Sequence, residues 1–361
     1  MHVEKVIGHR RDPVPPASTI PFMPDIVLVD IGAKKGNPTL KLLITGGAGF
    51  IGSHFAKRQL AAKSRWTQVI ILDALTYAGN RNNLLEIESD PRFTFVHGNI
   101  CETSLVDALT RDVNVIVNFA AESHVDRSLE NGNAFAQTNV MGTTNLLQAA
   151  LRNGVNLFHQ VSTDEVYGSI SSGSWDESFP LKPNSPYSST KASADLIALS
   201  YFRSFGLDVR ISRASNNYGT HQYPEKLIPL AITNLVRGLK VPIYGNGLNE
   251  RDWLHVGDHC RGIEAIMENG AAGEIYNIGG GNELTNLELV KLIVNGLGGS
   301  EESFEFVQDR KGHDLRYSVN TSKIERETGF KPQVEFEFGI FETIKWYKEN
   351  EKWWLPLVKE F

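Results

Sequence analysis

Short apolar runs alternate with helical stretches along most of the chain. The runs are rich in Val, Ile, Leu and Phe and cover residues 40–45, 69–72, 93–96, 113–119, 157–161 and 209–212. Runs of this length and composition are typical of strands buried on both faces of a parallel sheet. The stretches between them predict helices over residues 51–62, 104–110, 134–152 and 188–205. This alternation predicts an α/β fold, a doubly wound parallel sheet of the Rossmann type with right-handed crossovers.

The pattern differs at both ends of this region. Five prolines break the stretch before residue 40, at Pro13, Pro15, Pro16, Pro21 and Pro24. The run 26–31 could add a strand there, but a loosely held extension is the favoured interpretation. After residue 220 the alternation weakens, which favours a smaller mixed α/β domain. We expect an extension over 1–39, a dinucleotide-binding domain over 40–220 and a substrate domain over 221–361, some of whose segments return to the first domain.

Composition narrows the function classes. The chain has 361 residues, of which 41% are hydrophobic and 22% charged, and a formal net charge of -6. That balance argues against general binding to nucleic acid or to a membrane surface. The two cysteines, Cys101 and Cys260, cannot form a disulfide framework and favour a reducing compartment. With no run long enough to span a bilayer and no secretory signal, the expected location is the cytoplasm.

A glycine-rich turn follows the first predicted strand and opens the first predicted helix. Gly46, Gly49 and Gly52 have the spacing G-x-x-G-x-x-G, which allows a tight turn, close approach to a pyrophosphate and helix–sheet packing. The helix N-terminus then presents free N–H groups to the phosphate. Asp73 ends the second strand, where an acidic residue would bind the adenosine ribose. No cation stands beside Asp73 to hold a 2'-phosphate, so NAD is predicted rather than NADP.

Two further sets of residues are candidates for catalysis. Tyr187 and Lys191 are four residues apart at the start of a predicted helix and share a face. A lysine ammonium would lower the pKa of the phenol, which could then act as a general base. Thr163, Asp164 and Glu165 follow a buried strand, at the sheet edge where ligands bind. Two carboxyls in different surroundings can divide into an acid and a base, although an exposed helix face and an acidic loop would give the same two patterns.

These residues resemble those of the dTDP-glucose 4,6-dehydratases, within the extended short-chain dehydrogenase/reductases. The resemblance runs from residue 40 to about residue 354. Its most specific stretches are the Thr-Asp-Glu triplet and the run Ala-Ala-Glu-Ser-His-Val-Asp-Arg-Ser. The matching segments are residues 45–52, 75–80, 120–128, 162–168, 185–191, 215–219, 224–229, 251–253 and 312–317.

The resemblance implies a role for each matching residue. Thr163 would hydrogen-bond the hexose, Asp164 would be the acid and Glu165 the base, with Tyr187 and Lys191 completing the catalytic set. The implied cofactor residues are Gly46, Gly49, Phe50, Ile51, Gly52, Asp73, Leu75, Thr76, Asn99, Ile100, Ala120, Ala121, Ser123, Thr138, Tyr187, Lys191 and Asn217. The implied substrate residues are Ser123, Thr163, Asn216, Lys226, Leu227, Pro242, Tyr244, Arg251, Asn277, Arg310 and His313. No metal is expected.

The family resemblance implies an internal redox cycle on dTDP-glucose. The sugar is oxidised at C4, loses water across C5 and C6, and is reduced at C6. A 4-epimerase or decarboxylase on the same scaffold would share the glycine turn, Tyr187 and Lys191 but would not need Asp164 beside Glu165. A non-catalytic dinucleotide-sensing protein would have no reason to keep Tyr187 and Lys191 together with both carboxyls. The chain departs from the family pattern at Asn99, Thr220, His255 and Gly257.

Two expectations concern the whole protein. The helices predicted over 134–152 and 188–205 carry many apolar and small residues, and the resemblance implies that they pair as a four-helix bundle in a homodimer. The stripe comprises Ala136, Val140, Leu146, Leu147, Ala192, Ala194, Ile197 and Ala198. The extension 1–39 lacks periodicity and is expected to be dispensable for catalysis.

Overall fold

A seven-stranded parallel sheet forms the centre of Thr39–Phe361, one of two units into which the chain divides; the other is Met1–Pro38. The computed structural model describes residues 40–61, 64–309 and 313–358. The predicted extension 1–39, with its candidate strand 26–31, and the predicted substrate residue Arg310 therefore lie outside the described residues.

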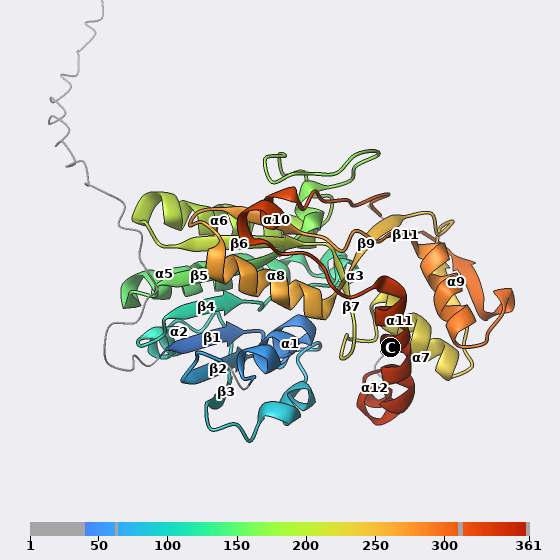
Figure 1. Cartoon of the computed structure of the whole chain (residues 1–361), viewed down its shortest axis with the longest axis horizontal. Coiled ribbons are helices and arrows are strands. Elements are labelled where there is room, and N and C mark those ends of the chain that lie inside the picture. The colour runs from blue at the N-terminus through green and yellow to red at the C-terminus, as the bar shows by residue number, and fades with distance from the viewer. Residues whose placement is uncertain (1–39, 62–63, 310–312, 359–361) are drawn as a thin grey trace, which may run out of the picture. The chain divides into compact units, whose positions relative to one another are not determined.

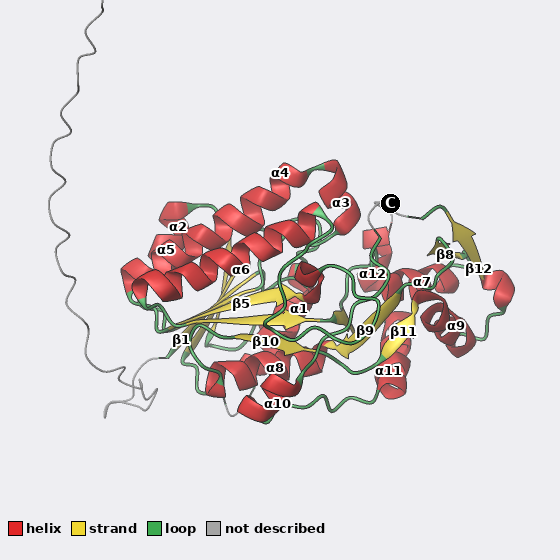
Figure 2. Cartoon of the chain, turned by 90° about the horizontal axis from the view of Figure 1, so that it is seen from above, coloured by secondary structure: helices red, strands yellow, loops and turns green. Residues whose placement is uncertain are grey.

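The sheet confirms the predicted strands and their parallel pairing. Its order, from one edge to the other, is β10 (Ile275–Ile278), β6 (Val209–Ala214), β5 (Leu157–Thr163), β4 (Val115–Asn118), β1 (Lys41–Thr45), β2 (Gln68–Asp73) and β3 (Phe93–His97). Figure 1 shows β6, β5, β4, β1, β2 and β3 side by side, and β10 is labelled in Figure 2. The chain runs from β1 outward to β3 and then crosses to β4 on the other side of β1, which creates a topological switch point. The edge strand β10 comes from a much later segment of the sequence.

Helices cover both faces of this sheet, as the strand–helix alternation predicts (Figure 2). One face packs against α1 (Phe50–Gln59) and α8 (Val256–Asn269), whose Phe55, Ala56 and Ile263 are fully buried. The opposite face packs against α2, α5 and α6 through residues such as Val106, Leu146 and Leu199. These helices span α2 (Thr103–Thr110), α5 (Thr143–Asn153) and α6 (Pro186–Phe205).

The helix predicted over residues 134–152 is a composite. It comprises α4 (Gly132–Phe135), a π-helical segment η2 (Ala136–Gly142) and α5. Within η2, buried Asn139 accepts a hydrogen bond from the Glu122 backbone N–H at 2.9 Å and donates to Thr190 Oγ1 at 2.9 Å. π-helical turns are frequent at functional sites, and this one places Thr138 beside the loop that follows β4.

The part of the chain after residue 215 adds two small sheets and its own core. β7 (Asn216–Tyr218), β9 (Glu250–His255) and β11 (Glu283–Thr285) form one sheet, and β8 (Val241–Tyr244) pairs with β12 (Phe304–Val307). Buried Ile232, Leu289 and Trp354 join their helices into one apolar cluster. The helices of this part are α7 (Leu227–Val236), α9 (Asn286–Gly296), α11 (Phe336–Glu349) and α12 (Glu351–Val358).

Shorter helical segments complete the described chain. They are η1 (Arg81–Ile87), α3 (Val125–Glu130), η3 (Asp164–Tyr167), η4 (Glu301–Ser303) and α10 (Ser322–Thr328). Among the described residues, every helix is too short or too polar to cross a membrane.

Candidate active site

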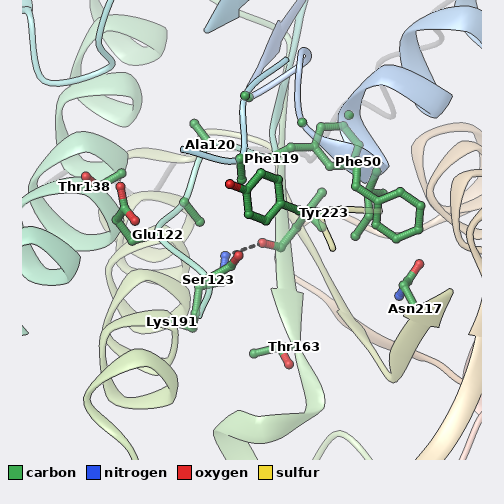
Figure 3. A pocket seen from close by; sticks show the side chains of 18 of the residues that line it. Phe50, Phe119, Ala120, Glu122, Ser123, Thr138, Thr163, Lys191, Asn217 and Tyr223 are labelled. Atoms are coloured by element: carbon green, nitrogen blue, oxygen red, sulfur yellow. Dashed lines mark hydrogen bonds between the residues drawn. The ribbon is translucent and has the colours of Figure 1, made fainter. Parts of the chain in front are cut away.

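A pocket lies at the edge where the parallel strands end. Its walls come from the loops after the strands β1 to β6, together with η2, α8 and the start of α6. In Figure 3, Thr138, Glu122 and Lys191 lie on one side of the pocket, and Phe50 and Asn217 lie on the other. The carboxyl edge beside a switch point is the usual ligand site of such sheets, so this pocket is the candidate active site.

The glycine turn forms one end of the pocket and permits close approach of the backbone. Gly46 has φ +67°, and a Cβ atom there would lie 2.6 Å from the Ala120 backbone N. A Cβ atom on Gly52 would clash with the Gly46 carbonyl oxygen. The turn leads directly into α1, whose first N–H groups have no partners within the helix. These features suit a diphosphate bound at the helix N-terminus.

Asp73 is fixed at the end of β2 rather than solvated. Its Oδ2 accepts a hydrogen bond from the Ala48 N–H and its Oδ1 accepts one from the Leu75 N–H, both at 2.8 Å. Burial raises the pKa of this carboxyl, and the two backbone donors oppose that shift. Each carboxylate oxygen keeps acceptor capacity for a ribose hydroxyl, while its charge would repel a 2'-phosphate.

The pocket fits a nicotinamide dinucleotide. The glycine turn and the first turn of α1 can hold the diphosphate of the dinucleotide. Asp73, on the same pocket wall, can bind its adenosine ribose. Of the predicted cofactor residues only Leu75 is absent from the pocket wall; its backbone N–H holds Asp73 instead. Those on the wall are Gly46, Gly49, Phe50, Ile51, Gly52, Asp73, Thr76, Asn99, Ile100, Ala120, Ala121, Ser123, Thr138, Tyr187, Lys191 and Asn217.

The backbone turns after Thr163, so that both carboxyl groups face the pocket. β5 ends at Thr163, and η3 (Asp164–Tyr167) begins at the next residue. Thr163 caps this turn, because its Oγ1 accepts a hydrogen bond from the Glu165 N–H at 3.3 Å. In a straight strand, adjacent side chains would point to opposite faces. The turn therefore explains how Asp164 and Glu165 can both reach one ligand.

The two carboxyls differ in their surroundings. Asp164 is 1% exposed, whereas Glu165 is only partly buried. Burial raises the pKa of Asp164 well above its usual value, and the nearby Glu165 and Asp252 carboxylates raise it further. Asp164 is therefore suited to hold a proton at neutral pH, which is the state a general acid requires.

Tyr187 and Lys191 are both buried on one face of α6, as their spacing predicts. The expected lowering of the Tyr187 pKa by Lys191 is wrong for this structure. Burial and, next, the Glu165 carboxylate raise that pKa well above 10.0. The Lys191 ammonium donates to the Val161 carbonyl oxygen at 2.6 Å, and burial lowers its pKa to about 8. Tyr187 instead makes a side-chain hydrogen bond with Thr163.

The predicted substrate residues divide into two groups. Four of them line the pocket, namely Ser123, Thr163, Asn216 and Lys226, and Lys226 Nζ donates to the Ser123 carbonyl oxygen at 3.0 Å. Six described ones do not line it, namely Leu227, Pro242, Tyr244, Arg251, Asn277 and His313.

Two of these six have their polar groups engaged elsewhere. The Arg251 guanidinium donates to backbone carbonyls, including that of Asp314 at 2.8 Å. The fully buried Asn277 side chain bonds Tyr167 and the Trp175 carbonyl.

Sequence reasoning missed an aromatic and charged cluster next to the pocket, of which Tyr223 and Glu225 line the pocket itself. Arg127 lies 3.9 Å over the Tyr77 ring and pairs with Glu225 at 3.1 Å. Tyr77 also meets Tyr223 edge-on, with ring centroids 5.6 Å apart. Tyr77, Arg127 and Glu225 fall within matching segments of the sequence, but spacing alone does not show that three loops meet here.

Comparisons with known proteins agree with this geometry. Residues 43–343 match the family model described as GDP-mannose 4,6 dehydratase. A dTDP-glucose 4,6-dehydratase of Streptomyces griseus is 54% identical over 325 residues, covering 89% of this chain and 98% of the relative. One of Actinoplanes sp. is 52% identical over 319 residues, covering 87% of this chain and 100% of the relative. Among solved structures, DesIV, a dTDP-glucose 4,6-dehydratase from Streptomyces venezuelae solved with NAD bound, is 56% identical with a TM-score of 0.87, covering 88% of this chain and 100% of that chain.

Proposed function

Because the chain belongs to the GDP-mannose 4,6 dehydratase family, and its relatives of more than half identity are dTDP-glucose 4,6-dehydratases, we propose that it dehydrates dTDP-glucose. The product is dTDP-4-keto-6-deoxyglucose, an intermediate of deoxysugar biosynthesis, and the cofactor is NAD. The observation that carries this function is the pair Asp164 and Glu165, which share one pocket with Tyr187.

The chain's own residues supply the proton transfers. The glycine turn and Asp73 would hold the dinucleotide, which would supply the hydride acceptor for C4 of the sugar and the hydride donor for C6. Tyr187, hydrogen-bonded to Thr163, takes the proton from the C4 hydroxyl as the ketone forms; the positive charge of a bound oxidised nicotinamide would oppose the rise that burial causes in its pKa. The 4-ketone acidifies the C5 hydrogen, which Glu165 removes. Asp164, whose pKa burial raises, donates a proton to the departing C6 hydroxyl, and water leaves; when hydride is returned to C6, Glu165 gives its proton back to C5.

Asp164 separates this function from its rivals. A 4-epimerase or decarboxylase on the same scaffold needs Tyr187 and Lys191 but no acid for a leaving hydroxyl. A dinucleotide sensor needs none of these groups. A buried carboxyl beside a second carboxyl is costly to retain without such a role. The placement of Asp164 therefore favours elimination.

The two parts of the chain divide the ligands between them in this proposal. Segment 40–220 binds NAD, and segment 221–361 holds most of the nucleotide of the substrate, with Ser123, Asn216 and Lys226 at their border. Leu227, Pro242, Tyr244, Arg251, Asn277, Arg310 and His313 stay predicted substrate residues. The support for them is the resemblance of their segments to the family.

We also propose that the protein acts as a homodimer in the cytoplasm. Support for the dimer comes from apolar side chains exposed on η2 and α6, such as Met141 and Leu196, which are 56% and 58% exposed. Support for the compartment comes from the thiols of Cys101 and Cys260, which are both unpaired.

A product assay tests the proposed function. The purified protein is incubated with dTDP-glucose and, in parallel, with UDP-glucose, and the products are analysed by mass spectrometry and NMR. We expect a 4-keto-6-deoxy sugar nucleotide, 18 Da lighter than its substrate, since one water is lost. A product of unchanged mass with inverted C4 would identify an epimerase and contradict the proposal.

A further inference from the structure

A buried ion pair lies behind the pocket and belongs to none of the roles described above. Arg213 on β6 is 2% exposed and Asp195 on α6 is fully buried, and Arg213 Nε donates to Asp195 Oδ2 at 2.9 Å. Neither residue lines the pocket. Because taking two charges out of water is costly unless further hydrogen bonds accompany the pair, its other partners show what it holds in place.

The second partner of Arg213 is Tyr167, the last residue of the turn η3 that carries both catalytic carboxyls. Arg213 Nη1 donates to the Tyr167 hydroxyl oxygen at 2.9 Å, and the guanidinium lies 4.8 Å from the centroid of the Tyr167 ring. Trp175 stacks on the same ring, with centroids 5.3 Å apart. Tyr167 is therefore held both by its ring and by its hydroxyl group.

The hydrogen bonds of the Tyr167 hydroxyl can run in only one direction. A guanidinium can only donate, so the hydroxyl accepts from Arg213 and gives its own proton to Asn277 Oδ1 at 2.9 Å. The orientation of the Asn277 amide agrees, because its Nδ2 donates to the Trp175 carbonyl oxygen at 3.0 Å. Burial raises the pKa of Tyr167 to about 12, so the hydroxyl keeps this proton at neutral pH.

The turn η3 is consequently joined to α6 at both of its ends. At its start, Thr163 makes a side-chain hydrogen bond with Tyr187, in the first turn of α6. At its end, Tyr167 is joined through Arg213 to Asp195, which lies eight residues after Tyr187 on the same helix. The two catalytic carboxyls of η3 lie between these anchor points.

From this arrangement, we propose that Tyr167 and Arg213 are positioning residues for the elimination step: with Asp195, they fix the far end of η3 to α6 and so hold the two carboxyls of η3 in place against the sugar. The inference deepens the proposed function and rests on it. Oxidation at C4 depends on Tyr187 and Thr163, at the other anchor point. Loss of the bond between Tyr167 and Arg213 should therefore slow elimination much more than oxidation.

A matched pair of tyrosine variants provides the test. Tyr167→Phe removes the hydroxyl and keeps the ring. The control is Tyr276→Phe on β10, because the Tyr276 hydroxyl also accepts one bond, from the Ala271 N–H at 2.8 Å, and donates one, to Glu327 at 3.0 Å. Tyr276 is buried like Tyr167, and neither residue lines the pocket.

Rapid mixing with dTDP-glucose, followed by NADH absorbance and by a product assay, gives separate rates for oxidation and for the steps after it. In Tyr167→Phe, we expect product formation to slow about tenfold or more, the scale of effects from small displacements of reacting groups, while NADH still forms within about twofold of the wild-type rate and accumulates. Tyr276→Phe should match wild type in both rates. General damage to the fold would slow both steps together.

A second variant tests the same link from its other side. Arg213→Lys keeps a cation for Asp195 but lacks the planar fork that reaches Asp195 and Tyr167 together, so it should show the same selective loss. Adding it to Tyr167→Phe should slow product formation no further than the slower single variant, because both changes break the same bond.

Hydrogen exchange gives a readout that does not depend on catalysis. The backbone amides of residues 165–168 should exchange faster in Tyr167→Phe than in wild type, because the end of η3 is no longer anchored. In Tyr276→Phe they should exchange at the wild-type rate.

Three outcomes would overturn the inference alone. They are product formation at the wild-type rate in folded Tyr167→Phe, equal slowing of NADH formation and product formation, and multiplied losses in the double variant. Loss of folded protein in both Tyr167→Phe and Arg213→Lys would show that the network supports the fold rather than the site, and would overturn it too. Wild-type protein that forms no 4-keto-6-deoxy sugar nucleotide would contradict the proposed function, on which the inference rests.

Discussion

At the scale of single residues, function depends on a difference in burial between two neighbouring carboxyl groups. Asp164 and Glu165 are adjacent in sequence, yet burial raises the pKa of Asp164 well above its usual value, whereas Glu165 stays partly exposed. The split arises because β5 ends between Thr163 and Asp164. Residue type alone does not show which carboxyl is the acid and which is the base. The difference in their burial supports Asp164 as the acid and Glu165 as the base.

The cofactor choice depends on one carboxylate. Asp73 is anchored by the Ala48 and Leu75 N–H groups and lines the pocket. We expect denatured protein to release NAD rather than NADP, and Asp73→Asn to weaken NAD binding about tenfold because a charged acceptor for the ribose is lost. Chromatography of the released nucleotide checks the first expectation. Release of mostly NADP would show that the carboxylate does not face the ribose.

Stability toward acid should depend on His54. Its Nε2 lies 2.9 Å from the Thr220 carbonyl oxygen, and burial lowers its pKa from 6.5 to about 4. Since the folded pKa lies below the unfolded one, the stabilisation is fully present above pH 6.5 and is lost as the pH falls toward 4. Between pH 7.5 and 5, wild type should lose about 1–2 kcal/mol more unfolding free energy than His54→Gln. Urea titrations at the two pH values measure this, and equal losses in both proteins would contradict it.

At the scale of elements, the helices α5 and α6 both build the core and offer an outer surface. Most residues of the apolar stripe expected at a dimer interface are buried in the interior of the chain. They include Leu146 and Leu147 on α5 and Ala194 and Ala198 on α6. The large apolar side chains exposed on this surface are Met141 on η2, Leu151 on α5, and Leu196 and Phe205 on α6. Of the expected stripe, Ala136, Val140 and Ile197 keep exposed surface and stay candidates for the interface of the proposed dimer.

The dimer can be tested at Leu196. Light scattering of wild type at micromolar concentration should give twice the chain mass, and Leu196→Glu should give the monomer mass because it buries a charge in the interface. Phe341→Glu is the matched control, since Phe341 is 63% exposed on α11 and lies outside that surface. A monomeric wild type would rule the dimer out.

The sequence predicts helices and strands better than it predicts contacts between segments that are distant in the chain. Apolar runs identify six strands because strands covered on both faces must be apolar throughout. The seventh strand, Ile275–Ile278, was missed because its run is short and lies among turns. Likewise, the glycine turn and Tyr187 follow from local spacing. The contact of Arg127 with Tyr77 does not, because it arises where loops distant in sequence converge.

At the scale of the whole molecule, the matched region accounts for the proposed chemistry. The family model begins at residue 43, and an entire relative aligns with 87% of this chain. We therefore expect a chain beginning near Pro38 to retain turnover within tenfold of the full chain. Steady-state kinetics of the two proteins check this. A larger loss, about 1.4 kcal/mol of barrier or more, would show that residues 1–37 contribute to the site.

The central claim is that Asp164 and Glu165 perform the elimination and Tyr187 starts the oxidation. Rapid mixing of Glu165→Gln and Asp164→Asn with dTDP-glucose, followed by absorbance of NADH and by a product assay, separates the two steps. We predict that NADH still forms transiently in both variants while product formation slows about a hundredfold or more, the usual scale of general acid–base catalysis. Elimination at the wild-type rate in either variant would contradict the account, and loss of NADH formation in both would show that the two carboxyls hold the substrate instead.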